Sequence, residues 1–133
     1  AHDVDIVAAN CARRRMPTGP TAQNYDENDK RKPVYTMPES TGLEEIGSVG
    51  TGVMLIKRTV FEGMTEPWFD MPWQTGTRGY MGEDVFFCKK AQELGFKVYI
   101  DHDVSKEIGH IGTFEFRHDH TWVMKEELEK EAV

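Results

Sequence analysis

The stretch GYMGEDVFFCKKAQELGFKVYID, residues 79–101, joins a glycine-rich turn to a helix and a strand. Apolar residues recur at helical spacing over residues 84–94, which predicts an amphipathic helix with its lysines on the outer side. Gly95 stands where a left-handed residue commonly ends a helix. Residues 96–100 alternate as a strand does. A helix that leads at once into a strand is typical of a mixed α/β domain, which is the fold class that we expect.

Two adjacent acids, Glu83 and Asp84, stand at the beginning of that helix. The positive end of a helix dipole favours a nearby carboxylate by roughly 0.3–1 kcal/mol, so helix capping explains one of the two. A carboxylate at the end of a loop can also act as a general base toward a substrate hydroxyl. Capping and catalysis therefore stand as two hypotheses for this pair.

Apolar runs elsewhere in the chain predict the remaining elements. The expected strands are residues 5–9, 33–36, 46–57 and 96–100, and the expected helices are residues 58–63, 84–94 and 119–131. The strand at 46–57 contains Gly47, Gly50 and Gly52, which mark either a bulged core strand or a backbone that passes close to a ligand. We expect one domain over residues 1–133, with long loops at 16–43 and 65–82 and a C-terminal helical extension at 113–133.

The composition excludes several classes of protein. Acids outnumber lysine and arginine by 23 to 16, and the net charge of −7 argues against a nucleic-acid partner. No apolar run reaches the roughly 18 residues of a transmembrane helix, so no transmembrane segment is expected. Cys11 and Cys88 lie in apolar surroundings without a CxxC motif, which predicts reduced thiols and a cytoplasmic location.

The beginning of the chain bears on its completeness. It has no initiator methionine and enters the strand at residues 5–9 almost at once. A buried parallel strand needs neighbours, so we expect the chain to be one part of a larger fold. An open sheet edge at residues 5–9 would invite pairing with another copy of the chain.

Three aromatic side chains, Trp68, Phe69 and Trp73, lie among proline and glycine in the loop at 65–82. Such residues either plug the core from a loop or offer flat platforms to sugar rings. Trp73 lies farthest from any regular element, and we expect it to face a ligand.

Histidines gather in the last third of the chain. His110 lies between glycines, where it is either a structural residue or a ligand that turns toward a bound ion. His118 and His120 lie in a polar stretch before the last helix and are expected to be solvated. A metal site built from His102 and these three would require them to converge, although their spacing matches no established His/Cys signature.

Four motifs occur in a fixed order. They are Val49-Gly50-Thr51-Gly52-Val53-Met54-Leu55-Ile56-Lys57-Arg58, Pro67-Trp68-Phe69, Gly82-Glu83-Asp84-Val85-Phe86-Phe87-Cys88 and Gly109-His110-Ile111-Gly112. This set resembles the C-terminal, acceptor-side half of an inverting glycosyltransferase with a GT-A fold, of the family-two-like kind. The resemblance runs from about Asp3 to Gly112, and the Gly-Glu-Asp element with its helix is the most specific part. It implies a partial GT-A, Rossmann-like mixed sheet flanked by helices, from which the nucleotide-binding half is absent.

The resemblance also implies an activity, which is the transfer of a sugar from a nucleotide-diphosphate donor to an acceptor hydroxyl with inversion. Asp84 would be the general base, and Glu83 would orient the acceptor. His110 would help to hold a divalent cation, Mn²⁺ or Mg²⁺, or the diphosphate itself. The same resemblance implies that Gly50, Thr51 and Gly52 line the donor cleft, that Trp68, Phe69 and Trp73 shape the acceptor site, and that Arg14 or Arg15 reaches phosphate.

One departure from the family's pattern affects the expected activity. Asp3-Val4-Asp5 does not supply the family's metal-binding Asp-x-Asp, because the apolar run follows it instead of preceding it. With half of the donor site absent, we expect the 133 residues alone to show little or no turnover. Two other classes remain open, which are a non-catalytic carbohydrate- or protein-binding module on a transferase scaffold and a metal-dependent hydrolase.

Overall fold

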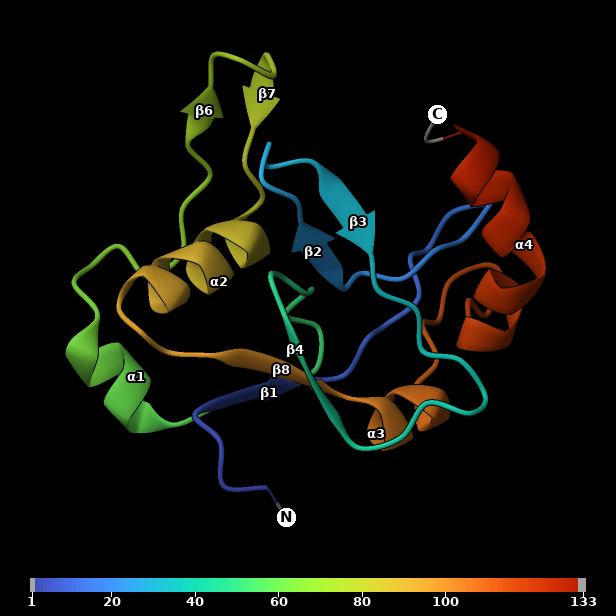
Figure 1. Cartoon of the computed structure of the whole chain (residues 1–133), viewed down its shortest axis with the longest axis horizontal. Coiled ribbons are helices and arrows are strands. Elements are labelled where there is room, and N and C mark those ends of the chain that lie inside the picture. Colours follow the sequence, from blue (N-terminus) through green and yellow to red (C-terminus); the bar gives the residue numbers. More distant parts are fainter. Residues whose placement is uncertain (1, 132–133) are drawn as a thin grey trace.

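The computed structural model describes residues 2–131 of the chain and shows a mixed α/β arrangement (Figure 1). The helices are α1 (Arg58–Gly63), α2 (Glu83–Glu93), α3 (His102–Glu107) and α4 (His118–Glu131). The strands are β1 (Ile6–Ala8), β2 (Gln23–Tyr25), β3 (Arg31–Pro33), β4 (Leu43–Ile46), β5 (Met54–Ile56), β6 (Trp73–Gln74), β7 (Gly79–Tyr80) and β8 (Val98–Asp101). The α/β class is confirmed, as are the helices at 58–63, 84–94 and 119–131, each within one residue at either end.

Four strands form the central sheet in the order β4-β8-β1-β5. β1 runs parallel to β8, whereas β5 pairs with β1 and β4 pairs with β8 in the antiparallel sense. Ile6 on β1 therefore stands between Ile56 on β5 and Val98 on β8. The expectation of an open edge at residues 5–9 is wrong, because β1 has a partner on each side. Within residues 2–131 the edges of this sheet are β4 and β5.

The single strand expected at residues 46–57 is two strands, β4 and β5, at opposite edges of the sheet. Between them the chain leaves the sheet and runs against β2, where Gln23 and Ser48 pair through their backbones. Gly47 is required at this crossing, because a Cβ there would lie 2.7 Å from the Tyr25 ring. The close approach that the glycines predict is therefore an approach to the β2–β3 hairpin.

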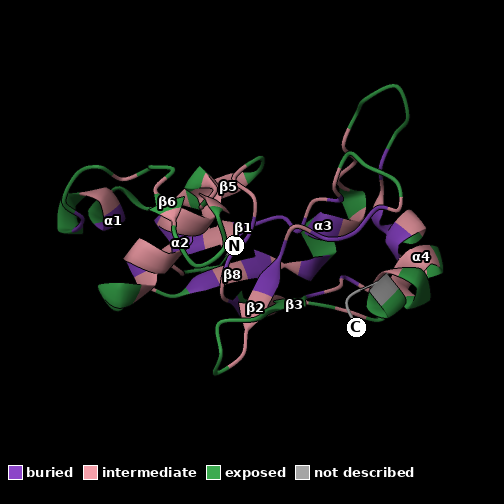
Figure 2. Cartoon of the chain, turned by 90° about the horizontal axis from the view of Figure 1, so that it is seen from above, coloured by how far each residue is buried: buried purple, intermediate pink, exposed green. Residues whose placement is uncertain are grey.

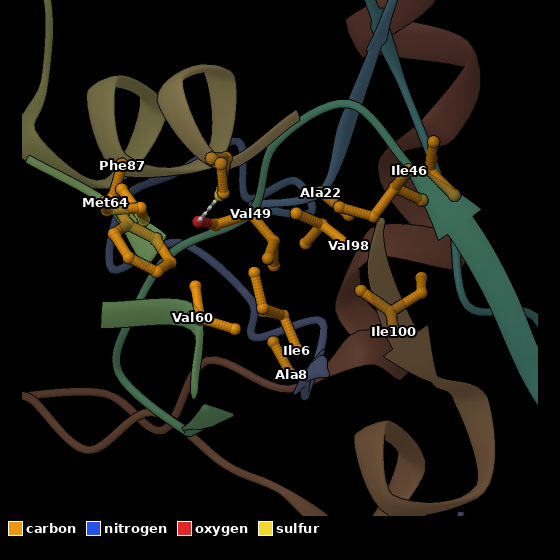
Figure 3. Packing of buried hydrophobic residues seen from close by; sticks show 13 residues of the cluster. Ile6, Ala8, Ala22, Ile46, Val49, Val60, Met64, Phe87, Val98 and Ile100 are labelled. Carbon is orange, nitrogen blue, oxygen red and sulfur yellow. Dashed lines mark hydrogen bonds between the residues drawn. The ribbon is translucent and has the colours of Figure 1, made fainter. Parts of the chain in front are cut away.

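The hydrophobic core lies between the central sheet and α2 (Figure 3). Phe87 and Ala91 project from α2 and are fully buried. Along β8, Val98 and Ile100 are fully buried, whereas Tyr99 between them is only half-buried. Figure 2 shows buried residues in the central strands, with exposed residues along the loops and on α4. Strand periodicity thus decides which sheet residues are sealed from water.

The opposite face of the sheet is much more open. Val7 stands level with Leu55 and Tyr99 in the sheet register, and Glu45 stands beside Tyr99. Leu55 is 74% exposed. The fold of residues 2–131 therefore buries one sheet face and leaves the other largely in contact with solvent.

Two hairpins occupy the segments that were expected to be long loops. β2 pairs with β3 within 16–43, and β6 pairs with β7 within 65–82. Their strands have only two or three residues, which is too short for an alternating pattern to show in the sequence. The strand expected at 33–36 lies earlier in the chain, since β3 ends at Pro33. Val34 follows the strand and is buried.

Helix α3 was not predicted. It begins immediately after β8, where the Asp101 side chain accepts hydrogen bonds from the backbone N–H groups of Asp103 and Val104. This is an N-cap interaction, and it converts the end of the strand into the beginning of a helix. A strand pattern that runs to residue 100 conceals such a short helix.

Helix α4 lies at the opposite end of the molecule from α1 (Figure 1). Its first turns are held by two side chains, since His118 Nε2 donates to the carbonyl of Asn10 and Trp122 Nε1 donates to that of Thr36. Leu128 in its second half packs beside Gly19. No helix within residues 2–131 is long and apolar enough to cross a membrane.

Candidate functional site

Asp84 is the second residue of α2, whose N-cap is Gly82. Its Oδ1 accepts a hydrogen bond of 2.7 Å from the backbone N–H of Val85. A Cβ on Gly82 would lie 2.9 Å from the same Oδ1, so the glycine leaves room for the carboxylate. One oxygen of Asp84 therefore makes a contact within the first turn, although it is not a cap, because the N-cap residue is Gly82 and the helix has no side-chain cap hydrogen bond. Its Oδ2 accepts no hydrogen bond from the described residues.

Asp84 also lines a cavity of about 310 Å³, hereafter the Asp84 cavity. Arg13, Arg31 and Tyr80 contribute further walls. Thr21 lines it too, and its buried Oγ1 has no hydrogen-bond partner among the described residues. A buried hydroxyl without a partner is unusual in a folded protein, because it has lost the water that it bonds in the unfolded chain. The cavity thus places a carboxylate close to an unsatisfied polar atom.

A second cavity of about 320 Å³, hereafter the arginine cavity, shares residues with the first. Arg13, Arg15 and Arg31 all line it, and Gln23, Arg13 and Arg31 line both cavities. Tyr35 forms another part of its wall, and the Tyr35 Oη is buried without a partner among residues 2–131. The two cavities therefore share one wall, which comes from the chain after β1 and from the β2–β3 hairpin.

The arginines that line the two cavities are not neutralised by ion pairs. Neither Arg13, Arg15 nor Arg31 forms a salt bridge with any carboxylate in the described part of the chain. Burial lowers the pKa of Arg13, and the nearby guanidinium groups of Arg15 and Arg31 lower it further. The negative charge of Asp84 acts on the Arg13 pKa in the opposite direction. The wall is therefore a site of positive potential within an acidic chain.

The other predicted basic and acidic residues lie outside these cavities. Arg14 is exposed, with its Cδ near Gly112. Glu83 is exposed at the first position of α2 and lines neither cavity. Of the predicted basic pair, Arg15 reaches the arginine cavity and Arg14 does not. Arg13, for which no role in a site was predicted, lines both cavities.

The predicted donor-side segment Gly50-Thr51-Gly52 lies beside the Asp84 cavity but does not line it. Its neighbour Val49 does line the cavity. Gly50 packs against Thr21, because a Cβ on Gly50 would lie 3.4 Å from the Thr21 Cβ, whereas Gly52 faces open space. Residues 50–52 thus follow directly after the last residue of this stretch that lines the cavity, Val49.

The three predicted aromatic residues fall into two groups. Trp68 donates from Nε1 to the carbonyl of Met64 and packs against the core, and Phe69 stacks on Phe87 with ring centroids 4.9 Å apart. Trp68 thus matches the expectation of a residue that plugs the core from a loop, whereas Phe69 covers Phe87 and remains 43% exposed. Trp73 is 55% exposed and meets Tyr80 edge-on at 5.2 Å between ring centroids. Since Tyr80 lines the Asp84 cavity, Trp73 supports one of its walls.

His110 was the predicted metal ligand. Its Nδ1 donates to the carbonyl of Ala12 at 2.9 Å, which leaves Nε2 as the acceptor. Metal-binding histidines commonly donate their other ring nitrogen to a carbonyl in this manner. His110 lines neither cavity, and no group of three or more His, Cys, Asp or Glu side chains suited to a metal occurs among the described residues. Among the described residues, His110 could therefore provide a cation with one ligand, but no complete metal site is present.

The four histidines do not converge. His102 donates from Nε2 to Glu44 at 2.8 Å, and its Nδ1 lies 3.0 Å from the Thr36 Oγ1. The order hydroxyl, imidazole, carboxylate is that of a hydrolase triad, but Thr36 is 0% exposed and its hydroxyl already accepts from Asn10. This group is therefore a structural hydrogen-bond network.

His118 is buried, contrary to the expectation of a solvated residue. Burial lowers its pKa to about 4, and the electrostatic effect of nearby His102 acts in the same direction. Its Nε2 donates to the carbonyl of Asn10, and its Nδ1 has no partner among residues 2–131. A neutral His118 therefore holds α4 on the end of β1. His120 packs against Phe114 instead.

Asn10 is a buried polar residue whose role was not expected from the sequence. It is 0% exposed, and its amide donates to the carbonyl of Val34 at 2.8 Å and to Thr36 at 3.1 Å. Its Oδ1 accepts from the backbone of Ala22 at 3.0 Å. An asparagine shortly after an apolar strand, where the chain must bend, is the only signal in the sequence. Its role is to join the end of β1 to two loops.

The thiols take no part in the site. Cys11 and Cys88 are both free, and Cys88 is fully buried with its Sγ 3.8 Å from the carbonyl oxygen of Val49. Burial raises the pKa of Cys88 to about 11. A thiol with so high a pKa is not a nucleophile at neutral pH.

Comparison of the chain with models of protein families, with curated proteins and with solved structures finds no match. The two cavities and the residues that line them are therefore the basis for inferring a function.

Proposed function

We propose that the chain is the acceptor-side part of an inverting glycosyltransferase with a GT-A fold. The observation that carries the proposal is that Asp84, at the start of α2, lines a cavity of about 310 Å³ while its Oδ2 accepts no hydrogen bond from residues 2–131. A general base needs both properties, since it must be held in place and must also reach the substrate. The resemblance of the Gly-Glu-Asp element to this class of enzyme agrees with that role.

In the proposed reaction Asp84 accepts the proton of the acceptor hydroxyl. The acceptor oxygen attacks the anomeric carbon of the donor sugar, and the bond from that carbon to the diphosphate oxygen breaks with inversion. The diphosphate leaves with the bonding electron pair, and Asp84 later releases its proton to water. The hydrogen bond from Val85 to Oδ1 fixes the carboxylate during these steps. Positioning of this kind supplies much of an enzyme's rate.

The donor side is less complete within this chain. A divalent cation, when bound, would neutralise the leaving diphosphate. His110 would contribute one ligand through Nε2, because Nδ1 is committed to Ala12. The candidate residues of this chain thus belong mainly to the acceptor side. Two free thiols also agree with a reducing, cytoplasmic setting, which is the location in this proposal.

The test is sugar transfer in a polypeptide that joins these residues to a nucleotide-binding half. Acceptor products would be measured by mass spectrometry with a set of nucleotide-diphosphate sugars and Mn²⁺. We expect Asp84→Asn to lower kcat by roughly 10²–10⁴, the usual contribution of general-base catalysis. The asparagine would keep the hydrogen bond from Val85, so folding and donor binding should be unchanged.

The matched control is Asp70→Asn. Asp70 is exposed and makes the same local contact, with Oδ1 accepting from the backbone of Met71 at 2.8 Å, but it lines neither cavity. We expect this variant to retain normal transfer. A normal kcat for Asp84→Asn would leave Asp84 with only its contact in the first turn and would favour a non-catalytic binding module.

A further inference from the structure

The arginine cavity has no role in the reaction described above. Arg13, Arg15 and Arg31 line it without an ion pair to any described carboxylate. The chain has 23 acids, so potential partners for three arginines are numerous. Guanidinium groups that share one cavity repel one another, and a bound anion removes this repulsion.

We propose that Arg13, Arg15 and Arg31 bind a phosphate group carried by the acceptor, whose hydroxyl lies at Asp84. This inference rests on the proposed function, because the hydroxyl is assigned to Asp84 there. It defines the acceptor as a phosphorylated hydroxyl compound. The shared wall of the two cavities then holds the two ends of one molecule.

The number of guanidinium groups selects phosphate over carboxylate. A phosphate monoester carries about −1.5 to −2 charges at neutral pH and offers three acceptor oxygens. Arginine binds such oxygens through two parallel N–H groups, and three arginines are more than one carboxylate can satisfy. Tyr35 also belongs to this wall, and its buried Oη lacks a partner within residues 2–131.

The position of the cavity selects the acceptor over the donor. Arg13 and Arg31 line the cavity that also contains Asp84, so a group bound there lies next to the proposed base. Of the residues assigned to the donor, His110 and the segment 50–52 line neither cavity, and Arg15, which was expected to reach phosphate, lines the arginine cavity. Two cavities with a common wall suit a single acceptor with two polar ends.

Helix α4 contributes to the arginine cavity through Leu128. Burial raises the pKa of Tyr35, and the negative charge of Glu129, the residue after Leu128, raises this pKa further. Glu129 is already engaged by Lys125 at 3.6 Å, and neither residue lines the cavity. The helix therefore shapes the cavity without neutralising its arginines.

The experiment is isothermal titration calorimetry of the 133-residue chain at low ionic strength. The probes are inorganic phosphate, glycerol 3-phosphate and acetate, with uridine diphosphate plus Mn²⁺ as the donor-side competitor. We expect both phosphate probes to bind and acetate to bind at least about tenfold more weakly. Arg15→Gln and Arg31→Gln should each weaken phosphate binding by about tenfold, as expected for the loss of a charge-assisted hydrogen bond.

Two neighbouring residues provide matched controls. Arg14→Gln and Lys32→Gln remove the same charge from adjacent positions that line neither cavity. We expect both to bind phosphate within about twofold of the unsubstituted chain, with a small difference from long-range charge alone. Thermal unfolding would verify that all four variants fold, which is expected because Arg15 and Arg31 are exposed.

Three results would overturn the inference. These are equal losses for the cavity and control variants, acetate binding as tight as phosphate binding, and displacement of glycerol 3-phosphate by uridine diphosphate with Mn²⁺, which would assign the arginines to the donor. Failure of the proposed function has a different signature. In that case Asp84→Asn leaves transfer unchanged, while the arginine variants still lose phosphate binding.

Discussion

Among the individual side chains, Asp84 combines two uses in one carboxylate. Its Oδ1 accepts from the backbone of Val85, and the same side chain lines a cavity beside Arg13. Gly82 makes the arrangement possible, because a Cβ there would meet Oδ1 at 2.9 Å. A contact within the first turn and a catalytic role are therefore compatible, and they predict different responses to substitution.

For stability, Asp84→Asn is expected to lower the free energy of unfolding by less than about 1 kcal/mol, because asparagine keeps the hydrogen bond from Val85 and loses only the negative charge near the helix N-terminus. Gly82→Ala is expected to cost roughly 1–3 kcal/mol, since the new methyl group collides with Asp84. Urea unfolding followed by circular dichroism measures both changes. A tolerated Gly82→Ala would show that the Asp84 side chain is free to move aside.

His118 predicts how stability depends on pH. Its pKa is about 4 in the folded protein against an ordinary value of 6.5, so between these values the unfolded chain binds a proton that the folded chain does not. The free energy of unfolding is therefore unaffected by this residue above pH 6.5 and decreases as the pH falls toward 4. The loss by about pH 4.5 is roughly 2–3 kcal/mol.

The measurement is urea unfolding at about pH 7.5 and about pH 4.5, on either side of the ordinary histidine pKa. His118→Gln keeps an N–H donor for Asn10 but does not titrate, so its stability should fall less between the two pH values. Acids with lowered pKa values, such as Asp101, are present in both proteins, so their contribution to the pH dependence cancels in the comparison. An equal loss in the two proteins would show that His118 is protonated in the folded state.

Among the secondary-structure elements, the connection between β4 and β5 passes close to β2 at a glycine. Gly47 passes beside the Tyr25 ring, where a Cβ would lie 2.7 Å from one ring carbon and 3.1 Å from the carbonyl oxygen of Gln23. Gly52, later in the same connection, has nothing within 4 Å of a Cβ. A side chain would therefore collide with its surroundings at Gly47 but not at Gly52.

Gly47→Ala is expected to lower the free energy of unfolding by roughly 1–3 kcal/mol, because Tyr25 and the hairpin must shift. Gly52→Ala is the control, and it should leave stability unchanged or raise it by up to roughly 1 kcal/mol, since alanine restricts the unfolded chain. Thermal unfolding would rank the two variants. Similar effects at both positions would contradict the packing of this segment on β2.

Across the molecule, Asn10 joins parts that are distant in the sequence. Its side chain reaches Val34, Thr36 and Ala22, and its carbonyl accepts from His118 on α4. The end of β1, the segment around the β2–β3 hairpin and the last helix therefore meet at one buried residue. Buried polar networks of this kind specify an arrangement because every unsatisfied member is costly.

Asn10→Ala is expected to destabilise the protein by roughly 3–5 kcal/mol, because it leaves several buried groups without partners. Asn28→Ala is the control, since Asn28 is exposed and its side chain makes no hydrogen bond within residues 2–131. Urea unfolding followed by tryptophan fluorescence would measure both. A cost for Asn10→Ala below about 1 kcal/mol, the typical value of one hydrogen bond, would show that the network does not hold the fold.

Elements with local signals could be predicted from the amino-acid sequence. The helices α1, α2 and α4 were predicted because apolar spacing and the residues at their ends act within a few turns, and the strand at 96–100 because alternation is visible over its length. Asp84 was placed at a helix start for the same reason, since neighbouring residues indicate where a helix begins. The very short hairpin strands β2, β3, β6 and β7 carry no such signal.

The meeting of distant residues, in contrast, became visible only in the folded chain. In the folded chain β1 lies between β5 and β8, so the edges of the central sheet are β4 and β5. Residues 46–57 are divided between these two edge strands. The fold also brings Arg13 and Arg31, which come from separate segments, into the wall shared with Asp84. The physical reason is that these arrangements follow from long-range strand pairing and from the burial of one sheet face. Such contacts depend on the whole chain, and no local pattern records them.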